Sequence, residues 1–519
     1  MSGTFRIGKV MVLLLLACAG TLLDGRVTNF TIPFQVDGIS SVPYTSFGPY
    51  STRINDGYES ENIISPVIPN SYQTFRSPHH VGVQFIGDNP KKLKSDHFQL
   101  QLTGPQGVVK TGPLSYESSG FVGVPVSGTL APGQYIVRFL TPGFQTAVST
   151  WRIEVNPWSA SQIRDLGSYL GTRLQGAYLS ALNTVRSRLY ESDVKWSQSL
   201  AYAAAAHARY LQRNGYHQPS FHLEQPSKPG FSGSDPWNRD MSFGWSSPLD
   251  GEVGIEWSVP VAPLTVIQNL IDTVYHRLSI LSPNAVAIGT GDSTGPSGAV
   301  VMDLGFGYRS ALPLAVVYPA ANQQGISTGW VDIESPDPVP GGFSRQFGYP
   351  ITVDFPTVQQ LADVKTQLTM GHTVVPTATD LPGFHNMASN QLGIVPSSVL
   401  RPNTHYSVSV TADALFNNDH RRRVHLQWHF ATGGSDQSVA VEPLSAVRLL
   451  VSVVKAGSGV PIAGEALRIY RSRPSSRAVV VGSGVTNDKG LVICRMPRAL
   501  TRQIFQVVTA SGNSAQFWW

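Results

Sequence analysis

The sequence predicts a multidomain chain in which one central α+β segment lies between all-β modules. A length of 519 residues is more than a single hydrophobic core normally serves, and it suggests three or four domains. Charged residues make up only 14% of the chain, while 49 Gly and 37 Pro exceed average usage, which favours short strands joined by many turns. Apolar residues alternate with period two in both flanks, whereas in the centre they recur every three or four positions.

Residues 1–19 have the composition of an export signal. Arg6 and Lys9 give a positive start, and Val10–Leu16 is an apolar run too short to span a bilayer. Two endings fit this segment: Ala17–Ala19 follows the small-x-small cleavage pattern, and the stretch ending in Cys18 resembles a bacterial lipobox, which would give a lipid anchor. No later stretch is long and apolar enough to span a membrane. We therefore expect an exported protein, extracellular or associated with the cell envelope.

Residues 29–155 are predicted to form an immunoglobulin-like (Ig-like) β-sandwich. Period-two alternation is clear in Phe98–Leu102, Gly133–Phe139 and Trp151–Val155, and Gly/Pro turns separate these stretches. Many short strands with this punctuation are typical of such sandwiches.

The periodicity changes after Asn156-Pro157, and residues 160–310 are predicted to form the α+β domain, because helices here flank a few strands. Its expected helices cover Leu179–Leu189, Leu200–Leu211 and Leu264–Ile280, and its expected strands cover Ala285–Gly291 and Ala299–Leu304.

Alternating strands return after Phe306, which predicts a second sandwich at 311–433 and a third at 445–519 of the Ig-like or carboxypeptidase-regulatory-like type. Cys494 lies in an apolar, strand-like run and has no partner within the chain once Cys18 is cleaved off or acylated. We therefore expect Cys494 to be a small buried hydrophobe.

The charge pattern argues against nucleic acid as a partner. The formal net charge is only +5, and its densest run, Arg421–Arg423, is one local cluster, which we interpret as a solvated loop. Sequence motifs of serine hydrolases, zinc proteases and phosphate-binding loops are also missing from the sequence.

The candidate chemistry is an imidazole–carboxylate set in the centre of the chain. His222 and Glu224 lie in a polar loop, Glu252 and Glu256 follow in an acidic stretch, and His276 ends a helical segment. Imidazoles and carboxylates that converge on one cleft are what a divalent metal or a general acid/base site requires. His207, in an alanine-rich helix, is interpreted as a hydrogen-bonded core or interface residue, and Arg239 as a member of a structural ion pair.

Several pieces of the central region, in a fixed order, resemble the CAP superfamily of cysteine-rich secretory proteins, antigen 5 and plant pathogenesis-related proteins. The resemblance covers about residues 165–310 and is strongest to the bacterial, disulfide-free branch, also termed SCP-like. The matching pieces are Leu182–Arg186, Val194–Leu200, Ala205–Leu211, Pro229–Gly233, Tyr275–Arg277, Leu281–Asn284 and Ile288–Gly291.

The resemblance implies an α–β–α sandwich with a cleft lined by two histidines and two acidic residues, which in several members bind a divalent metal. On this pattern His222 and His276 are the histidines and Glu252 is the acid, with Glu256 as its fallback. For the second acid the choice stays open between Glu224 and Asp272. The metal, if one binds, would be zinc, held by His222, His276 and Glu252.

Three functions remain open at this stage. The first is an exported bacterial binding protein whose cleft holds a small ligand, lipid or wall component while the β modules act as accessory domains. The second is a metal-assisted hydrolase with Glu252 as general base. The third is an adhesive protein whose cleft is a relic.

Overall fold

The computed structural model places the central and C-terminal parts of the chain, together with the strands of the N-terminal part. The described residues are 29–34, 42–47, 65–69, 72–74, 80–86, 99–113, 115–116, 121–125, 133–140, 149–155, 166–167, 174–216, 220–243, 245, 250–257, 261–293, 298–307, 312–382, 387–416, 420–471, 479–497 and 504–518. The expected export signal at 1–19 and the alternative lipid attachment at Cys18 lie outside them. No helix among the described residues is long and apolar enough to cross a membrane.

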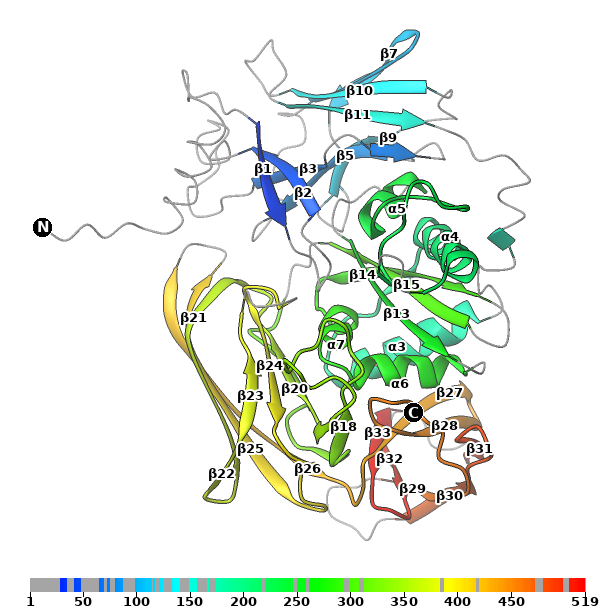
Figure 1. Ribbon diagram of the computed structural model, residues 1–519, viewed down its shortest axis with the longest axis vertical. Helices are drawn as coiled ribbons and strands as arrows, with labels where there is room; N and C mark the ends of the chain where they lie inside the picture. Colours follow the sequence, from blue (N-terminus) through cyan, green and yellow to red (C-terminus); the bar gives the residue numbers. More distant parts are fainter. Residues whose placement is uncertain are drawn as a thin grey trace, which may run out of the picture.

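The N-terminal part contains two sheets (Figure 1). Their strands are β1 (Asn29–Phe34), β2 (Val42–Phe47), β3 (Ser65–Pro69), β4 (Tyr72–Thr74), β5 (His80–Ile86), β6 (Gln99–Gly104), β7 (Gly107–Pro113), β8 (Ser115–Tyr116), β9 (Phe121–Pro125), β10 (Gly133–Leu140) and β11 (Ser149–Val155). One sheet has the order β1-β2-β3-β5-β9-β8 and the other β4-β11-β10-β6-β7.

A four-stranded sheet of order β12-β14-β15-β13 forms the centre of the molecule. Its strands are β12 (Lys195–Trp196), β13 (Asp250–Trp257), β14 (Ala285–Asp292) and β15 (Gly298–Phe306). Helices α4 (Gln198–Asn214) and α5 (Pro236–Ser242) lie on one side of it, and α3 (Gln175–Arg188), α6 (Pro263–Ile271) and α7 (Tyr275–Ile280) on the other (Figure 1). A multidomain chain with a helical centre and β-rich flanks is therefore confirmed.

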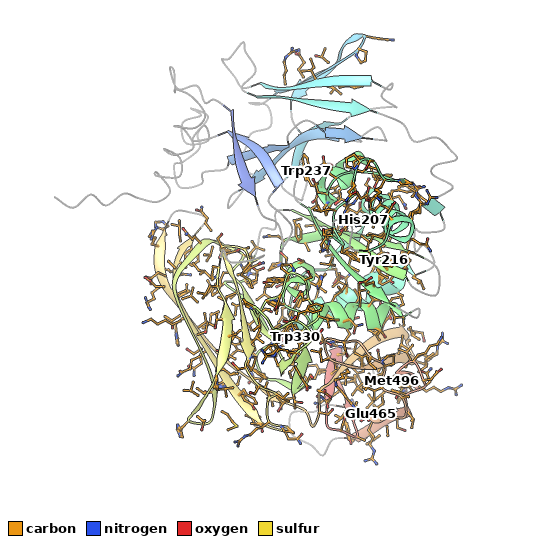
Figure 2. All side chains as sticks on the ribbon, in the orientation of Figure 1. His207, Tyr216, Trp237, Trp330, Glu465 and Met496 are labelled. Atoms are coloured by element: carbon orange, nitrogen blue, oxygen red, sulfur yellow. The ribbon has the colours of Figure 1, made fainter. Side chains whose placement is uncertain are left out.

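Helix α4 approaches the sheet very closely because both surfaces lack bulk. The helix begins after Ser197, whose side chain accepts from the Leu200 amide, and its buried face is mostly alanine. Opposite it stand Gly289 and Gly291 on β14, where an added Cβ would come within 2.0 Å and 2.3 Å of the α4 backbone. His207 (Figure 2) is carried on this same helix and is fully buried.

We expect Gly289→Ala to lower the free energy of unfolding by about 3 kcal/mol or more, because the new methyl group overlaps rigid helix backbone. Gly176→Ala is the matched control: it lies in α3 with nothing within 4 Å of the added Cβ. That variant should gain about 0.5–1 kcal/mol from higher helix propensity. Chemical denaturation of both variants checks this, and equal stabilities would contradict the close approach of α4 to β14.

The single helix predicted over Leu264–Ile280 is wrong, because the chain breaks it into α6 and α7. The amides of residues 274–276 bond to the carboxylate of Glu334, from a distant segment. The acidic stretch that contains Glu252 is also a regular strand, β13, which pairs along its whole length with β15. The strands expected at Ala285–Gly291 and Ala299–Leu304 are present as β14 and β15.

After the central unit the chain forms a second β module of two main sheets and one strand pair. The sheets have the orders β16-β20-β24-β23 and β17-β26-β25-β21-β22, and the pair is β18-β19. The strands are β16 (Val316–Tyr318), β17 (Gln323–Ile326), β18 (Gly329–Val331), β19 (Gln346–Gly348), β20 (Ile351–Asp354), β21 (Val358–Met370), β22 (Thr373–Val375), β23 (Thr377–Asp380), β24 (Gln391–Pro396), β25 (His405–Phe416) and β26 (Arg421–Thr432). The run Arg421–Arg423 therefore begins a strand instead of a loop, although all three side chains are exposed.

The last module packs a sheet β27-β28-β31 against a sheet β30-β29-β32-β33. The strands are β27 (Gln437–Ser445), β28 (Arg448–Lys455), β29 (Ala466–Arg471), β30 (Val479–Val485), β31 (Leu491–Arg495), β32 (Ile504–Thr509) and β33 (Ser514–Trp518). Cys494 is buried in this core as an unpaired thiol, as predicted.

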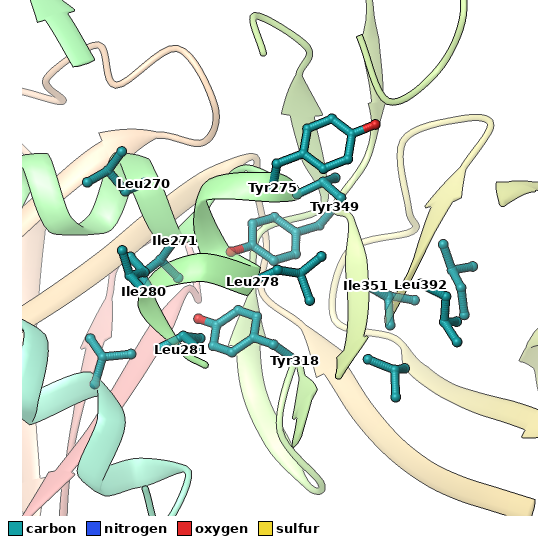
Figure 3. Packing of buried hydrophobic residues seen from close by; sticks show 14 of the residues in the cluster. Leu270, Ile271, Tyr275, Leu278, Ile280, Leu281, Tyr318, Tyr349, Ile351 and Leu392 are labelled. Atoms are coloured by element: carbon teal, nitrogen blue, oxygen red, sulfur yellow. The ribbon is translucent and has the colours of Figure 1, made fainter. Parts of the chain in front are cut away.

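The central unit and the second β module share one apolar core. Figure 3 shows Leu278 of α7 near Tyr349 of the β module, with Leu270 and Ile271 of α6 and Ile351 of β20 in the same packed region. Both groups belong to one continuous cluster of buried hydrophobic side chains. The two units are therefore packed as one body and not joined as beads on a string.

Asp272, at the end of α6, makes a polar link among three parts of the chain. One of its carboxylate oxygens accepts from Tyr349 (2.7 Å) of the second module, Ser438 (2.9 Å) of β27 and Gln268 (2.8 Å) of its own helix. Burial raises the pKa of Asp272 to about 6, against the effect of these three donors. The residue is therefore part of a module junction, which explains why α6 ends here.

We expect Asp272→Asn to become more stable relative to wild type as the pH rises from 4 to 7. A folded-state pKa above the ordinary 3.8 means that the stability contributed by the protonated acid is present below pH 4 and lost as the pH passes about 6. The raised pKa of Asp272 corresponds to a loss of about 3 kcal/mol of folding free energy at neutral pH, where the acid must ionise inside the protein. The amide of the Asn variant carries no charge and does not incur this loss. Unfolding temperatures across this range test the prediction. Asp488→Asn, in an exposed turn, should track wild type, and a pH-independent effect of Asp272→Asn would contradict it.

Candidate functional site

His222 and Glu252 meet at the edge of the central sheet. Glu252 lies on β13, and His222 lies in the loop between α4 and α5. The His222 Nδ1 is 2.9 Å from the Glu252 Oε1, so Nδ1–H donates to this carboxylate. The Glu252 side chain is fully buried, whereas that of His222 is 26% exposed. The predicted acid–histidine pair is thus in contact, with the imidazole as its accessible member.

Arg239 holds the other oxygen of Glu252. Asp235, which accepts from the Asn238 amide, and Pro236 start the short helix α5, which carries Arg239 into the interior. Its Nη2 donates to the Glu252 Oε2 at 2.6 Å and to the backbone oxygen of His222 at 3.1 Å. Arg239 therefore forms a buried ion pair with Glu252, as expected from the sequence.

The surrounding charges keep Glu252 ionised. Burial favours the neutral acid, but Arg239, His207 and His222 outweigh it and hold the pKa of Glu252 well below its usual range. Burial lowers the pKa of Arg239, but the carboxylates of Glu252, Glu224 and Asp303 outweigh it and raise this pKa above its ordinary value. Glu252 is thus a fixed anion whose two oxygens already have partners.

His207 links this ion pair to Glu224. Its Nδ1 is 2.9 Å from the Glu224 Oε1 and its Nε2 is 2.6 Å from the backbone oxygen of Phe221. A carbonyl oxygen and an ionised carboxylate can only accept, so both ring nitrogens must donate and the ring is an imidazolium. Its Nε2 is also 3.7 Å from Glu252. His207 is therefore a buried structural cation, in agreement with the core interpretation.

Two further carboxyls lie behind Glu252. Asp303 stands opposite Glu252 in the β13–β15 register, and Asp240 is carried on α5 beside Arg239. Burial raises the pKa of both well above the ordinary value, and it is assisted by the charge of Asp303 at Asp240 and by that of Glu252 at Asp303. Neither has a neutral hydrogen-bond donor within reach among the described residues. We interpret them as a carboxyl–carboxylate pair that shares a proton, because two like charges this close cannot both ionise without water.

His276 lies at the start of α7, with a side chain that is 19% exposed. Its Nδ1 is 3.0 Å from the Thr273 hydroxyl and 3.1 Å from the Glu334 Oε1. The pKa of His222 is lowered mainly by burial; Glu252 opposes this, and His276 and His207 lower it further.

The alternate acids are placed differently. Glu224 belongs to the same buried charge cluster through His207 and Ser232. Glu256 lies on the same face of β13 as Glu252, but it is exposed, and the Phe221 ring packs against Gly254 between the two acids. Asp272 is held in the module junction.

The arrangement does not fit a preassembled zinc site. No group of three or more His, Cys, Asp or Glu among the described residues is placed to hold a metal ion. Both oxygens of Glu252 already accept hydrogen bonds, from His222 at 2.9 Å and from Arg239 at 2.6 Å, and the side chain is fully buried.

Sequence reasoning missed Asp240, Asp303 and Glu334. Asp303 carried a signal, because it is a single acid in the otherwise apolar strand β15. Glu334 carried none, because its partners lie in another module.

A small sheet between helices, with His222 over a buried charge cluster and His276 at the start of α7, defines the central unit as an α+β domain. Residues 179–304 match the cysteine-rich secretory protein family, so the central segment of the chain is a CAP domain. No curated protein matches the chain.

Some solved structures resemble parts of the chain weakly. Native alpha-2-macroglobulin from Escherichia coli, spanning domains MG0-NIE-MG1, is 12% identical over 33% of this chain and 66% of its own, with a TM-score of 0.13. Salmonella alpha-2-macroglobulin reacted with methylamine is 10% identical over 95% of this chain and 24% of its own, with a TM-score of 0.17. The tetra-tandem repeat of a large adhesion protein is 11% identical over 84% and 93%, with a TM-score of 0.13. With such scores these likenesses carry no weight for function.

We expect Arg239→Met to lower the free energy of unfolding by about 3–5 kcal/mol, because Glu252 would remain as a buried charge without its guanidinium partner. Arg423→Met is the matched control. Arg423 pairs with Asp413 at 2.8 Å, but both side chains are about half exposed (51% and 43%), so its loss should cost less than about 1 kcal/mol. Urea denaturation measures both, and equal losses would refute the assigned role of Arg239.

Proposed function

We propose that the protein is an exported CAP-domain binding protein whose site holds a small ligand, lipid or cell-wall component through hydrogen-bond donors on that ligand. In this proposal the central sheet and helices are the α–β–α sandwich of the family, and the flanking modules are Ig-like accessory domains. Residues 1–19 act as the export signal, which is either cleaved to release the protein or replaced by a lipid anchor at Cys18.

The observation that carries the proposal is the state of the two imidazoles. His222 donates its Nδ1–H to Glu252, and the Nδ1 of His276 faces Thr273 and Glu334. Both rings are partly exposed, and the contacts that hold each ring in place are made by its Nδ1. A neutral imidazole with its Nδ1 proton engaged presents an Nε2 lone pair, which accepts from a hydroxyl, amide or ammonium group.

The same contacts favour binding over hydrolysis. A general base works best with a pKa near the working pH, whereas the pKa of Glu252 is held far below it. Its carboxylate is also buried beneath His222, so it does not reach a substrate directly. His222 and His276 can contact a ligand, but Glu252 is better suited to orient a ring than to remove a proton.

We expect His222→Ala and His276→Ala each to weaken binding at least tenfold, because each removes a charge-free acceptor that no other side chain replaces. Binding should also fall on acidification, at a pH below the ordinary imidazole range, because the pKa of His222 is lowered and its protonation removes the lone pair. The probes are soluble peptidoglycan fragments and phosphatidylglycerol vesicles, measured by calorimetry from pH 4 to 8.

His425→Ala is the matched control, because this histidine is exposed on β26 of the second module. It should bind both probes as wild type does. Zn²⁺ alone is titrated in parallel, with turnover assayed on the peptidoglycan fragments. Stoichiometric zinc lost in the double histidine variant, together with turnover lost with it, would replace this proposal by the hydrolase. Unchanged probe binding in both single variants would reject the site itself.

A further inference from the structure

Glu334 reaches the central unit from the second β module. It lies between β18 and β19, and its side chain is only 1% exposed. Its Oε1 accepts from the backbone amides of Tyr275 (2.7 Å) and His276 (3.1 Å), and its Oε2 accepts from the amide of Val274 (2.7 Å). One carboxylate thus satisfies three amides at the start of α7, a role that nearby side chains usually fill.

The same carboxylate faces the ring of His276. Its Oε1 is 3.1 Å from the His276 Nδ1, and the Thr273 hydroxyl is 3.0 Å from that nitrogen on the neighbouring turn. The Thr273 hydroxyl donates its own hydrogen to the backbone oxygen of Leu270 at 2.8 Å, so towards His276 it can only accept. Both groups around Nδ1 are therefore acceptors, which requires hydrogen on Nδ1, and the neutral ring then has its lone pair on Nε2.

The loop that carries Glu334 is held in place by its own bonds. The Glu334 amide donates to Asp332, a buried acid, at 3.2 Å. Asp337 accepts from the amides of Val339 (2.8 Å), Gly342 (2.9 Å) and Phe343 (3.2 Å) further along. The carboxylate is thus presented from a fixed backbone, as a positioning group requires.

We infer that Glu334 is a positioning residue for His276, so that the two-histidine site is assembled from the central unit and the second β module together. It orients the helix start that carries His276 and selects the Nδ1–H form of the ring. The part of this inference that concerns ligand contact rests on the proposed function, whereas the state of the ring does not.

The test reads the ring of His276 directly. The full-length chain is labelled with ¹⁵N-histidine, and long-range ¹H–¹⁵N spectra are recorded at pH 7.5, with His276 assigned by its loss in His276→Gln. Wild type should show the Nδ1–H form almost alone. In Glu334→Gln the fraction with hydrogen on Nε2 should rise several-fold, because an amide no longer supplies a charge-assisted acceptor. Glu334→Asp, which keeps the charge but shortens the reach, should give an intermediate ratio.

Glu465→Gln is the matched control, because this carboxylate also accepts from a backbone amide, that of Ser511 at 2.9 Å, in the last module. It should leave the His276 signals unchanged. Wild-type signals in Glu334→Gln would overturn the inference. If Glu334→Gln does not fold, Glu334→Asp decides, and a wild-type ratio there overturns it. A shifted ring combined with unchanged probe binding in His276→Ala would uphold the positioning role and reject the binding function.

Discussion

The site depends on keeping the carboxylate of Glu252 ionised inside the protein. A buried anion is stable only with compensating charge and a full set of hydrogen bonds. Arg239, His222 and His207 provide these from α5, from a loop and from α4, so one carboxylate ties three elements to the edge strand β13. The orientation of the His222 ring is then a consequence of burying an acid, and it needs no separate cause.

His276 is also positioned by a buried carboxylate, but this carboxylate, Glu334, comes from a distant part of the chain. Carboxylates fix both ends of the segment between α6 and α7. Asp272 accepts hydrogen bonds from donors in both C-terminal modules, and Glu334 accepts hydrogen bonds from the amides at the start of α7. These hydrogen bonds explain why the segment Leu264–Ile280, although its apolar residues have helical periodicity, forms two helices instead of one. They also fix the position of His276, whose Nδ1 faces Thr273 and Glu334.

Local patterns predicted the elements well, and long-range contacts account for what they missed. The alanine run and the alternating strands predicted α4, β14 and β15, and the resemblance to the CAP superfamily led to His222 and Glu252. The break at residues 272–274 was not predictable, because Glu334 and Tyr349 lie 58 and 77 residues away along the chain. Glu252 and Glu256 lie on the same face of β13, so the alternation of the strand does not distinguish them. In the structure the Phe221 ring packs against Gly254 between the two acids. Asp303 could have been suspected as a lone acid in an apolar strand, whereas Glu334 could not.

The reach of Glu334 into the central unit also bears on the order in which the protein matures. A ribosome completes the segment with His222, Glu252 and His276 before it makes Glu334, and Ser438 comes later still. While that tail is unfinished, the amides that begin α7 must bond to water, and the apolar side of both short helices lacks its cover. One imidazole can therefore reach its final form early, whereas the other must wait for later chain. The central unit therefore reaches its final form only when the second β module is present.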